Sequence, residues 1–189
     1  MNRRTILAGV SLIGAIPSFV AAQTPYPMPR GQTVPDGMMD PASARTEADF
    51  RMGVIGPAEL SLATSRIAMD KATNRNADEF AGFEMEEAVA VTTVLKDLNT
   101  PIPTPDEKAR MILESIERTR RGPEFDRIYI QAQLENHEYL RDLAMGYLRN
   151  SRDATDPAEK HGRHLATLSL AVFKEHVAIT QRIANELRG

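Results

Sequence analysis

Acidic side chains lie on a helical stretch that is otherwise apolar along one face. Within residues 75–98, Glu84 and Glu87 follow the same four-and-three spacing as the apolar residues Phe80, Val91, Val94 and Leu98. This spacing predicts that both carboxylates share the inward face of a helix. Because a buried, unpaired carboxylate is costly, we expect each one to be paired, protonated or bound to a metal ion.

Two histidines hold comparable positions in the second half of the chain. His137 shares a face of residues 123–149 with Asp126, three helical turns earlier. His176 lies on the apolar stripe of residues 157–187, which also contains Leu165, Leu168, Val172, Ile179 and Ile183. Imidazoles in such positions are either hydrogen-bonded core residues or metal ligands.

These side chains are candidates for a metal site. Carboxylates and imidazoles that project inward from facing helices are the usual way in which helical bundles bind metals. Fe, Mn and Zn all accept such a mixed oxygen and nitrogen donor set. Glu59 joins the set because it lies beside the apolar stripe of residues 44–73. The candidate ligands are therefore Glu59, Glu84, Glu87, His137 and His176.

Other chemistry is less favoured by the sequence. His161 and His164 lie three residues apart beside Arg163 near a predicted helix start, which is typical of a solvated surface. The sequence has no Gly-x-Ser-x-Gly motif, no Gly-rich phosphate loop and no cysteine. The twin Glu-x-x-His motifs of di-metal bundles are also absent. The sequence thus favours a binding protein over an enzyme.

The elements that must position these residues are helices. The helical period predicts long helices over residues 44–73, 75–98, 123–149 and 157–187, and a short one over residues 105–119. Gly56-Pro57 predicts a kink or a short break. Thr104 is the predicted N-cap of the short helix. The expected fold is all-α: a ferritin-like four-helix bundle with a short extra helix between the second and third long helices.

The chain begins with the pattern of a cleavable signal peptide over residues 1–22. Arg3 and Arg4 precede an apolar run, and small residues fit cleavage between Ala22 and Gln23. The two arginines fit both general and twin-arginine export. We therefore expect a periplasmic or secreted protein.

Two further segments follow the predicted signal peptide. Residues 23–43 are rich in proline and predict an extended or disordered linker. Residues 44–189 are expected to form the bundle domain, which contains no apolar run long enough to span a membrane.

Charge argues against a nucleic-acid partner. The formal net charge is −3, and removal of residues 1–22 makes the chain more acidic because it removes arginines and no acidic residue. An acidic chain without a basic patch lacks the electrostatic basis for binding nucleic acid.

Four short motifs carry a family resemblance: Ala58-Glu59-Leu60, Glu79-Phe80-Ala81, the run from Gly122 to Tyr129 followed by His137, and Glu175-His176. The chain from Phe50 to Leu187 resembles a bacterial family of exported, ferritin-like proteins of unknown function, often labelled as outer membrane proteins. The third motif is the most specific, and it adds Asp126 and Tyr129 to the residues of interest. The resemblance implies the fold and export but no established activity.

The chain departs from the family pattern in the second long helix. The family usually has an Asp-His pair at positions that correspond to Glu87 and Ala88, and an apolar residue where this chain has Glu84. The resemblance therefore implies that a histidine ligand is lost or exchanged for Glu84, which argues against a di-metal oxidase.

Two functions follow as expectations. The first is an exported bundle that binds a metal ion or a small ligand in its core. The alternative is a non-catalytic envelope or stress protein that acts through its surface.

Overall fold

The computed structural model describes residues 39–189, and the predicted signal peptide lies outside them. The described residues form a 3-10 turn and five helices, and no strand. The elements are η1 (Pro41–Ser43), α1 (Glu47–Lys71), α2 (Arg75–Asp97), α3 (Glu107–Arg118), α4 (Pro123–Asn150) and α5 (Pro157–Glu186). The predicted all-α fold of four long helices and one short helix is confirmed.

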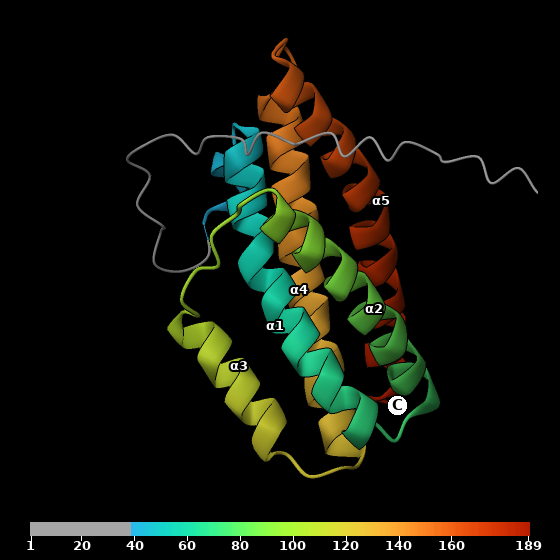
Figure 1. Cartoon of the computed structure of the whole chain (residues 1–189). Helices are drawn as coiled ribbons and strands as arrows, with labels where there is room; N and C mark the ends of the chain where they lie inside the picture. The colour runs from blue at the N-terminus through green and yellow to red at the C-terminus, as the bar shows by residue number, and fades with distance from the viewer. Residues whose placement is uncertain (1–38) are drawn as a thin grey trace, which may run out of the picture.

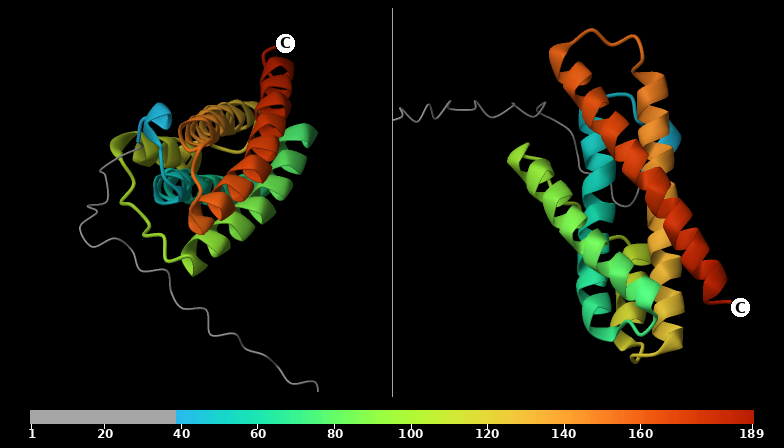
Figure 2. Two further views of the ribbon diagram at one scale, coloured as in Figure 1. Left: turned by 90° about the horizontal axis from the view of Figure 1, so that it is seen from above. Right: turned by 90° about the vertical axis from the view of Figure 1, so that its right-hand side faces the viewer.

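The four long helices form a bundle of two layers. α1 packs antiparallel against both α2 and α4, and α4 packs antiparallel against α5 (Figure 1). α2 and α5 are inclined in the same sense across the pair α1 and α4 (Figure 2). The backbones of α2 and α5 hardly touch, which makes this the loosest side of the bundle. α3 lies outside the bundle against α1 and α4.

The helix starts are set by side-chain caps at most positions. Asp156 Oδ1 accepts hydrogen bonds from Ala158 N and Glu159 N, as the Asp-Pro start of α5 predicts. The predicted N-cap Thr104 is wrong: Asp106 caps α3, because its Oδ1 accepts the Ala109 N–H at 2.8 Å.

Two backbone features depart from simple helix rules. α1 continues through Pro57 without interruption, so the alternative of a short break is wrong. Gly122 precedes α4 with a φ of +147°, a conformation that glycine adopts far more readily than residues with a Cβ. Gly122 thereby directs the chain from the loop into α4.

The structured part of the chain begins before residue 44. η1 packs against α4, where Gly146 comes so close that a Cβ would lie 2.2 Å from Pro41 O. Asn150 Nδ2 donates to the Ala42 and Ala44 carbonyls. The end of the predicted linker is thus ordered against the bundle.

The apolar core has two clusters at different levels of the bundle. One includes Phe50, Leu140 and Tyr147, and the other includes Phe80, Phe125 and Tyr129. The apolar stripes of α2 and α5 are not fully buried: Val94, Leu165 and Leu168 are exposed, contrary to the prediction. Their exposure follows from the loose packing of α2 against α5. Among the described residues, no helix is long and apolar enough to cross a membrane.

Candidate metal centre

A polar layer separates the two apolar clusters. All four long helices contribute to it, and its buried members are Ser61, Thr64, Ser65, Glu84, Gln133, His137, His176 and Thr180. Because the core is apolar on both sides of this layer, each polar group in the layer destabilises the fold unless it has a hydrogen-bond partner. The arrangement of donors and acceptors within the layer therefore indicates what it can bind.

Three side chains converge at the centre of the layer. Glu84 Oε2 lies 3.2 Å from His137 Nε2 and 2.9 Å from His176 Nδ1. The two ring nitrogens are 3.1 Å apart. Glu84, His137 and His176 form the group of possible metal ligands found among the described residues. They come from α2, α4 and α5, so the group joins three helices.

Contacts behind His137 determine where its proton lies. Its Nδ1 is 2.8 Å from the Gln133 carbonyl oxygen, one turn earlier in α4. A carbonyl can only accept, so Nδ1 carries the proton and donates it. In the neutral ring, Nε2 then presents a lone pair to Glu84 and His176. A histidine that donates its other N–H to a backbone carbonyl is the usual form of a metal ligand.

His176 is oriented in the same way by a carboxylate. Its Nε2 lies 3.3 Å from Glu87 Oε2, and its Nδ1 lies 2.9 Å from Glu84 Oε2 and 3.1 Å from His137 Nε2. A proton on Nε2 leaves the lone pair of Nδ1 facing Glu84 and His137, whereas a proton on Nδ1 is donated to them. Glu87 is half-buried and lies at the edge of the cluster, so it supports His176 from the outer side.

Glu84 is held in its ionised form. Burial alone would raise the pKa of Glu84, but the charge of a protonated His137 and hydrogen bonds from His137, His176 and Ser61 lower the pKa to about 2. Ser61 Oγ donates to Glu84 Oε1. Glu84 Oε2 is the oxygen that faces the two imidazoles, and it receives these hydrogen bonds when the facing ring nitrogens carry protons.

Positive charge is therefore needed between the three groups. Burial lowers the pKa of His176, but a hydrogen bond to Glu84 and the charges of Glu84 and Glu87 outweigh it and raise the pKa. Burial also raises the pKa of Glu87, and a protonated His176 only partly offsets this. The carboxylate of Glu84 thus attracts either a proton onto an imidazole or a cation between the three lone pairs.

The separations fit a bound transition-metal ion. Adjacent ligands about 2.1 Å from an octahedral ion are about 3.0 Å apart, and tetrahedral ligands at the same distance are about 3.4 Å apart. The observed separations of 3.1 and 3.2 Å lie within this range, and the separation of 2.9 Å lies just below it. Two imidazoles and one carboxylate on one face of an ion are a familiar donor set for iron and zinc.

Aromatic rings enclose the two imidazoles. Phe80 packs edge-on against His176 with ring centroids 5.2 Å apart, and against His137 at 6.1 Å. Phe173 lies 6.3 Å from His137 on another side. These apolar walls limit access of water to the inner part of the cluster and hold the rings in place.

Asp126 and Tyr129, which belong to the motif from Gly122 to Tyr129, form hydrogen bonds with α1 and with the turn that follows it. Asp126 accepts hydrogen bonds from Thr73 N, Thr73 Oγ1 and Asn74 N, so it fixes the turn between α1 and α2. The Tyr129 hydroxyl lies 2.9 Å from Ser65 Oγ, and burial raises the pKa of Tyr129 well above its usual value. Neither residue belongs to the ligand group.

Glu59 does not join the cluster. It forms an ion pair with Lys96 of α2 at 2.6 Å and is partly exposed. Its position one residue off the apolar stripe turns it toward the bundle surface, where lysine can reach it. Of the five candidate ligands, the structure brings together Glu84, His137 and His176, with Glu87 beside them.

Ser61 and Gln133 are the site residues that sequence reasoning undervalued. Ser61 donates to Glu84, and Gln133 links the layer to Ser61, Thr64 and Ser65. The signal was present: Ser61, Thr64 and Ser65 share the face of α1 that also contains its apolar residues. Small hydroxyl residues at these positions are common helix-packing residues, so the pattern alone does not indicate a site.

The fold and the site together define a helical bundle with a carboxylate–imidazole cluster in its core. Residues 32–182 match a family described as "Domain of unknown function (DUF4142)". The chain belongs to this family, as the sequence resemblance predicts. Neither the comparison with curated proteins nor that with solved structures gives a match.

Proposed function

We propose that this protein binds a divalent transition-metal ion through Glu84 Oε2, His137 Nε2 and His176 Nδ1. Iron, manganese and zinc are the ions expected for this donor set. The proposed compartment is the periplasm or the exterior of the cell, which rests on the signal-peptide pattern of residues 1–22. The proposal includes no catalytic step.

One observation supports the proposal above the others. Three possible ligand atoms from three helices lie within 3.2 Å of one another, and His137 Nδ1 donates to the Gln133 carbonyl, so the lone pair of His137 Nε2 faces the other two atoms. With no proton on the facing ring nitrogens, three acceptors at this distance repel one another unless a cation lies between them. A metal ion satisfies all three at once, whereas a proton satisfies a single pair.

The chain's departure from its family agrees with this donor set. Ala88 is buried and offers no ligand, while Glu84, one turn earlier, reaches both histidines. The described cluster therefore has one carboxylate in direct contact with the imidazoles on the inner side. This favours a single ion over a pair of bridged ions.

The test is elemental analysis of protein purified without chelator. We expect about one metal ion per chain in the wild-type protein and almost none in the double variant His137→Ala/His176→Ala. The matched control is His161→Ala/His164→Ala, which also loses two histidines but at exposed positions in α5.

The isosteric variant Glu84→Gln separates binding from folding. It keeps the shape of the side chain but removes the negative charge that attracts the ion, so it should fold and lose metal. The proposal is wrong if wild type and both double variants carry equal metal, or if metal-free wild type takes up no Fe²⁺, Mn²⁺ or Zn²⁺. Either outcome would favour the alternative of a protein that acts through its surface.

A further inference from the structure

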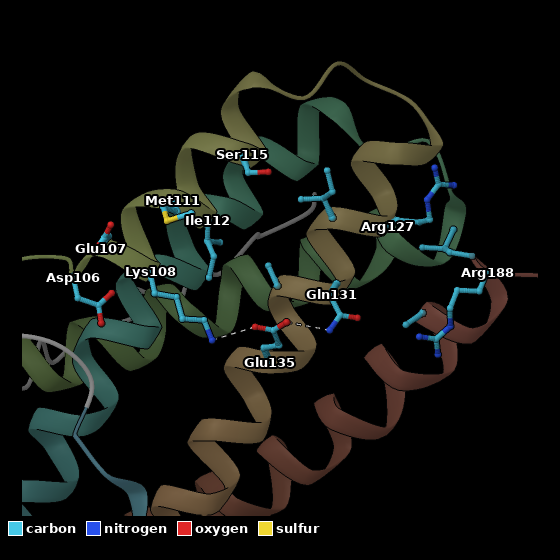
Figure 3. Close-up of a pocket in the computed structure, with 14 residues that line it drawn as sticks. Asp106, Glu107, Lys108, Met111, Ile112, Ser115, Arg127, Gln131, Glu135 and Arg188 are labelled. Carbon is cyan, nitrogen blue, oxygen red and sulfur yellow. Dashed lines mark hydrogen bonds and ion pairs between the residues drawn. The ribbon is translucent and has the colours of Figure 1, made fainter.

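A large groove lies on the side of the bundle away from α2. Its floor is α4, and its walls are α3 and the end of α5 (Figure 3). Its volume is about 1070 Å³, which is ample for a small organic ligand. It shares no lining residue with the metal centre, so its use is independent of the metal proposal.

The groove is apolar along its middle. The apolar side chains that line it are Met111, Ile112, Ile128, Ala132, Ala184 and Leu187. Met111 is 64 % exposed, although it belongs to an amphipathic helix. The reason is that α3 has a single buried residue, Ile116, near its end. The earlier turns of α3 therefore stand beside α4 without closing over it, and apolar surface remains uncovered between them.

The two ends of the groove differ in charge. Arg127 and Arg188 flank one end of the groove, and their guanidinium groups point to opposite sides of it (Figure 3). At the other end Lys108 is neutralised by Glu135 at 3.2 Å, and Glu135 also accepts from Gln131.

The arginine end has no acidic partner within the part of the chain that the structure describes. The side chain of Arg127 forms no hydrogen bond or ion pair there, and Arg188 donates to the neutral side chain of Asn185. The arginine end thus has two guanidinium groups that are not neutralised by an acidic side chain. Such guanidinium groups match a carboxylate or phosphate in shape and charge.

We propose that this groove binds a single-chain amphiphilic anion. Its charged head lies at the end that Arg127 and Arg188 flank, and its alkyl body covers the apolar floor toward Ile112 and Met111. Along α4, Arg127 and Glu135 are eight residues apart, or about 12 Å, which sets the length of the apolar body. Beyond this point the groove is lined by Asp106, Glu107 and Glu135, which disfavour a second negative charge at the far end of the ligand.

The apolar floor and the arginine end together indicate the chemical class of the ligand. A compact inorganic anion would leave the apolar floor exposed to water, and a neutral alkane would leave the arginines unused. An anion with an alkyl chain satisfies both parts of the groove in one orientation. Monomeric carboxylate amphiphiles are the simplest molecules of this class.

Calorimetric titration with decanoate in the presence of EDTA tests the proposal, because EDTA prevents any carboxylate–metal bond from contributing. We expect saturable binding of one decanoate per chain. The double variant Arg127→Gln/Arg188→Gln should weaken it by about fivefold or more. Ala132→Phe, which fills the floor of the groove, should abolish it. The matched control Arg121→Gln removes one exposed arginine that does not line the groove and should bind as wild type does.

Three results would overturn the proposal. Decanol or decyltrimethylammonium could bind as well as decanoate, which would show that the arginines do not select the ligand. The arginine double variant could bind as well as Arg121→Gln. Vesicles of anionic phospholipid could bind the protein while monomeric decanoate does not, which would indicate a membrane surface instead. Circular dichroism of each variant verifies that the helices are intact.

Discussion

At the scale of single residues, the positions of the imidazole protons decide the chemistry of the cluster. His137 donates to the Gln133 carbonyl, so its Nε2 lone pair faces Glu84, and a proton on His176 Nε2, which lies 3.3 Å from Glu87, leaves the Nδ1 lone pair facing Glu84 as well. The same three side chains with reversed ring tautomers would form an ordinary hydrogen-bonded network. The supporting acceptors behind the histidines therefore matter as much as the ligands.

Glu87 is predicted to position His176 rather than to bind the ion. Glu87→Ala should weaken Zn²⁺ binding by about 10- to 100-fold, the usual effect of removing an acceptor behind a histidine ligand. Glu87→Gln keeps an acceptor oxygen and should recover most of the affinity. The measurement is calorimetric titration of the metal-free protein with Zn²⁺. A complete loss of binding in both variants would instead identify Glu87 as a direct ligand.

The pKa of Glu84 predicts how the metal-free protein responds to acid. A carboxyl whose pKa is lowered from 4.5 to about 2 stabilises the fold above pH 4.5, and this contribution is lost as the pH falls toward 2. It is on the order of 3 kcal/mol. Urea unfolding at pH 6 and pH 3 should therefore show a larger loss of stability for wild type than for Glu84→Gln. Equal losses in the two proteins would contradict the assignment.

At the scale of elements, close approach determines where small residues are needed. η1 lies against α4 at Gly146, with the Pro41 carbonyl oxygen where a Cβ would be. Gly82 in α2 is half-buried but has room for a Cβ, whose nearest neighbour would be Met69 Sδ at 3.8 Å. The same substitution should thus have opposite effects at the two sites.

Gly146→Ala is predicted to destabilise the protein by about 1–3 kcal/mol, because η1 must move or the helix must shift. Gly82→Ala should stabilise it by about 0.5–1 kcal/mol, since alanine has a higher helix propensity than glycine. Urea unfolding of both variants measures the difference. If Gly146→Ala were neutral or stabilising, η1 would not be packed against α4 in solution.

Sequence periodicity predicted the helices well because each depends on local signals. The Asp156-Pro157 start and the apolar period of residues 75–98 lie within single elements, and α2 and α5 begin where these signals place them. The exposure of Val94 and Leu165 could not be predicted, because it depends on the separation of α2 from α5. Periodicity assigns a face to a residue but does not show whether another helix covers that face.

The candidate site was predictable in part for the same reason. The helical period indicated that Glu84, His137 and His176 face inward, but not that they lie at one level. The level depends on the vertical offset between helices, which the lengths of the loops and the packing of both apolar clusters determine. Glu59 lies a small angle around the helix axis from the apolar stripe of α1, and it therefore pairs with Lys96 instead of joining the cluster.

At the scale of the whole molecule, the cluster joins the loosest side of the bundle. α2 and α5 hardly touch through their backbones, and Glu84 and Glu87 of α2 reach His176 of α5 across the gap. An ion that binds α2, α4 and α5 together would therefore restrain the side of the bundle where the backbones have the fewest close contacts. Binding should be strongly linked to global stability.

Metal binding is predicted to raise the melting temperature. Free Zn²⁺ at about 100 times its dissociation constant stabilises the native state by about 2.7 kcal/mol, or roughly 5–10 °C for a chain of this size. Scanning calorimetry of the metal-free protein with and without Zn²⁺ measures this shift. His161→Ala/His164→Ala should retain the shift, and His137→Ala/His176→Ala should lose it. An equal shift in both variants would place the stabilising ion elsewhere.

Anomalous X-ray diffraction from crystals of the protein grown with Zn²⁺ tests the metal centre itself. We expect an anomalous peak about 2.0–2.2 Å from Glu84 Oε2, His137 Nε2 and His176 Nδ1. We also expect His176 Nε2 to donate to Glu87 in the metal-bound protein. A well-ordered cluster without a peak, or a peak confined to surface residues such as His161 and His164, would show that these three side chains do not bind the ion.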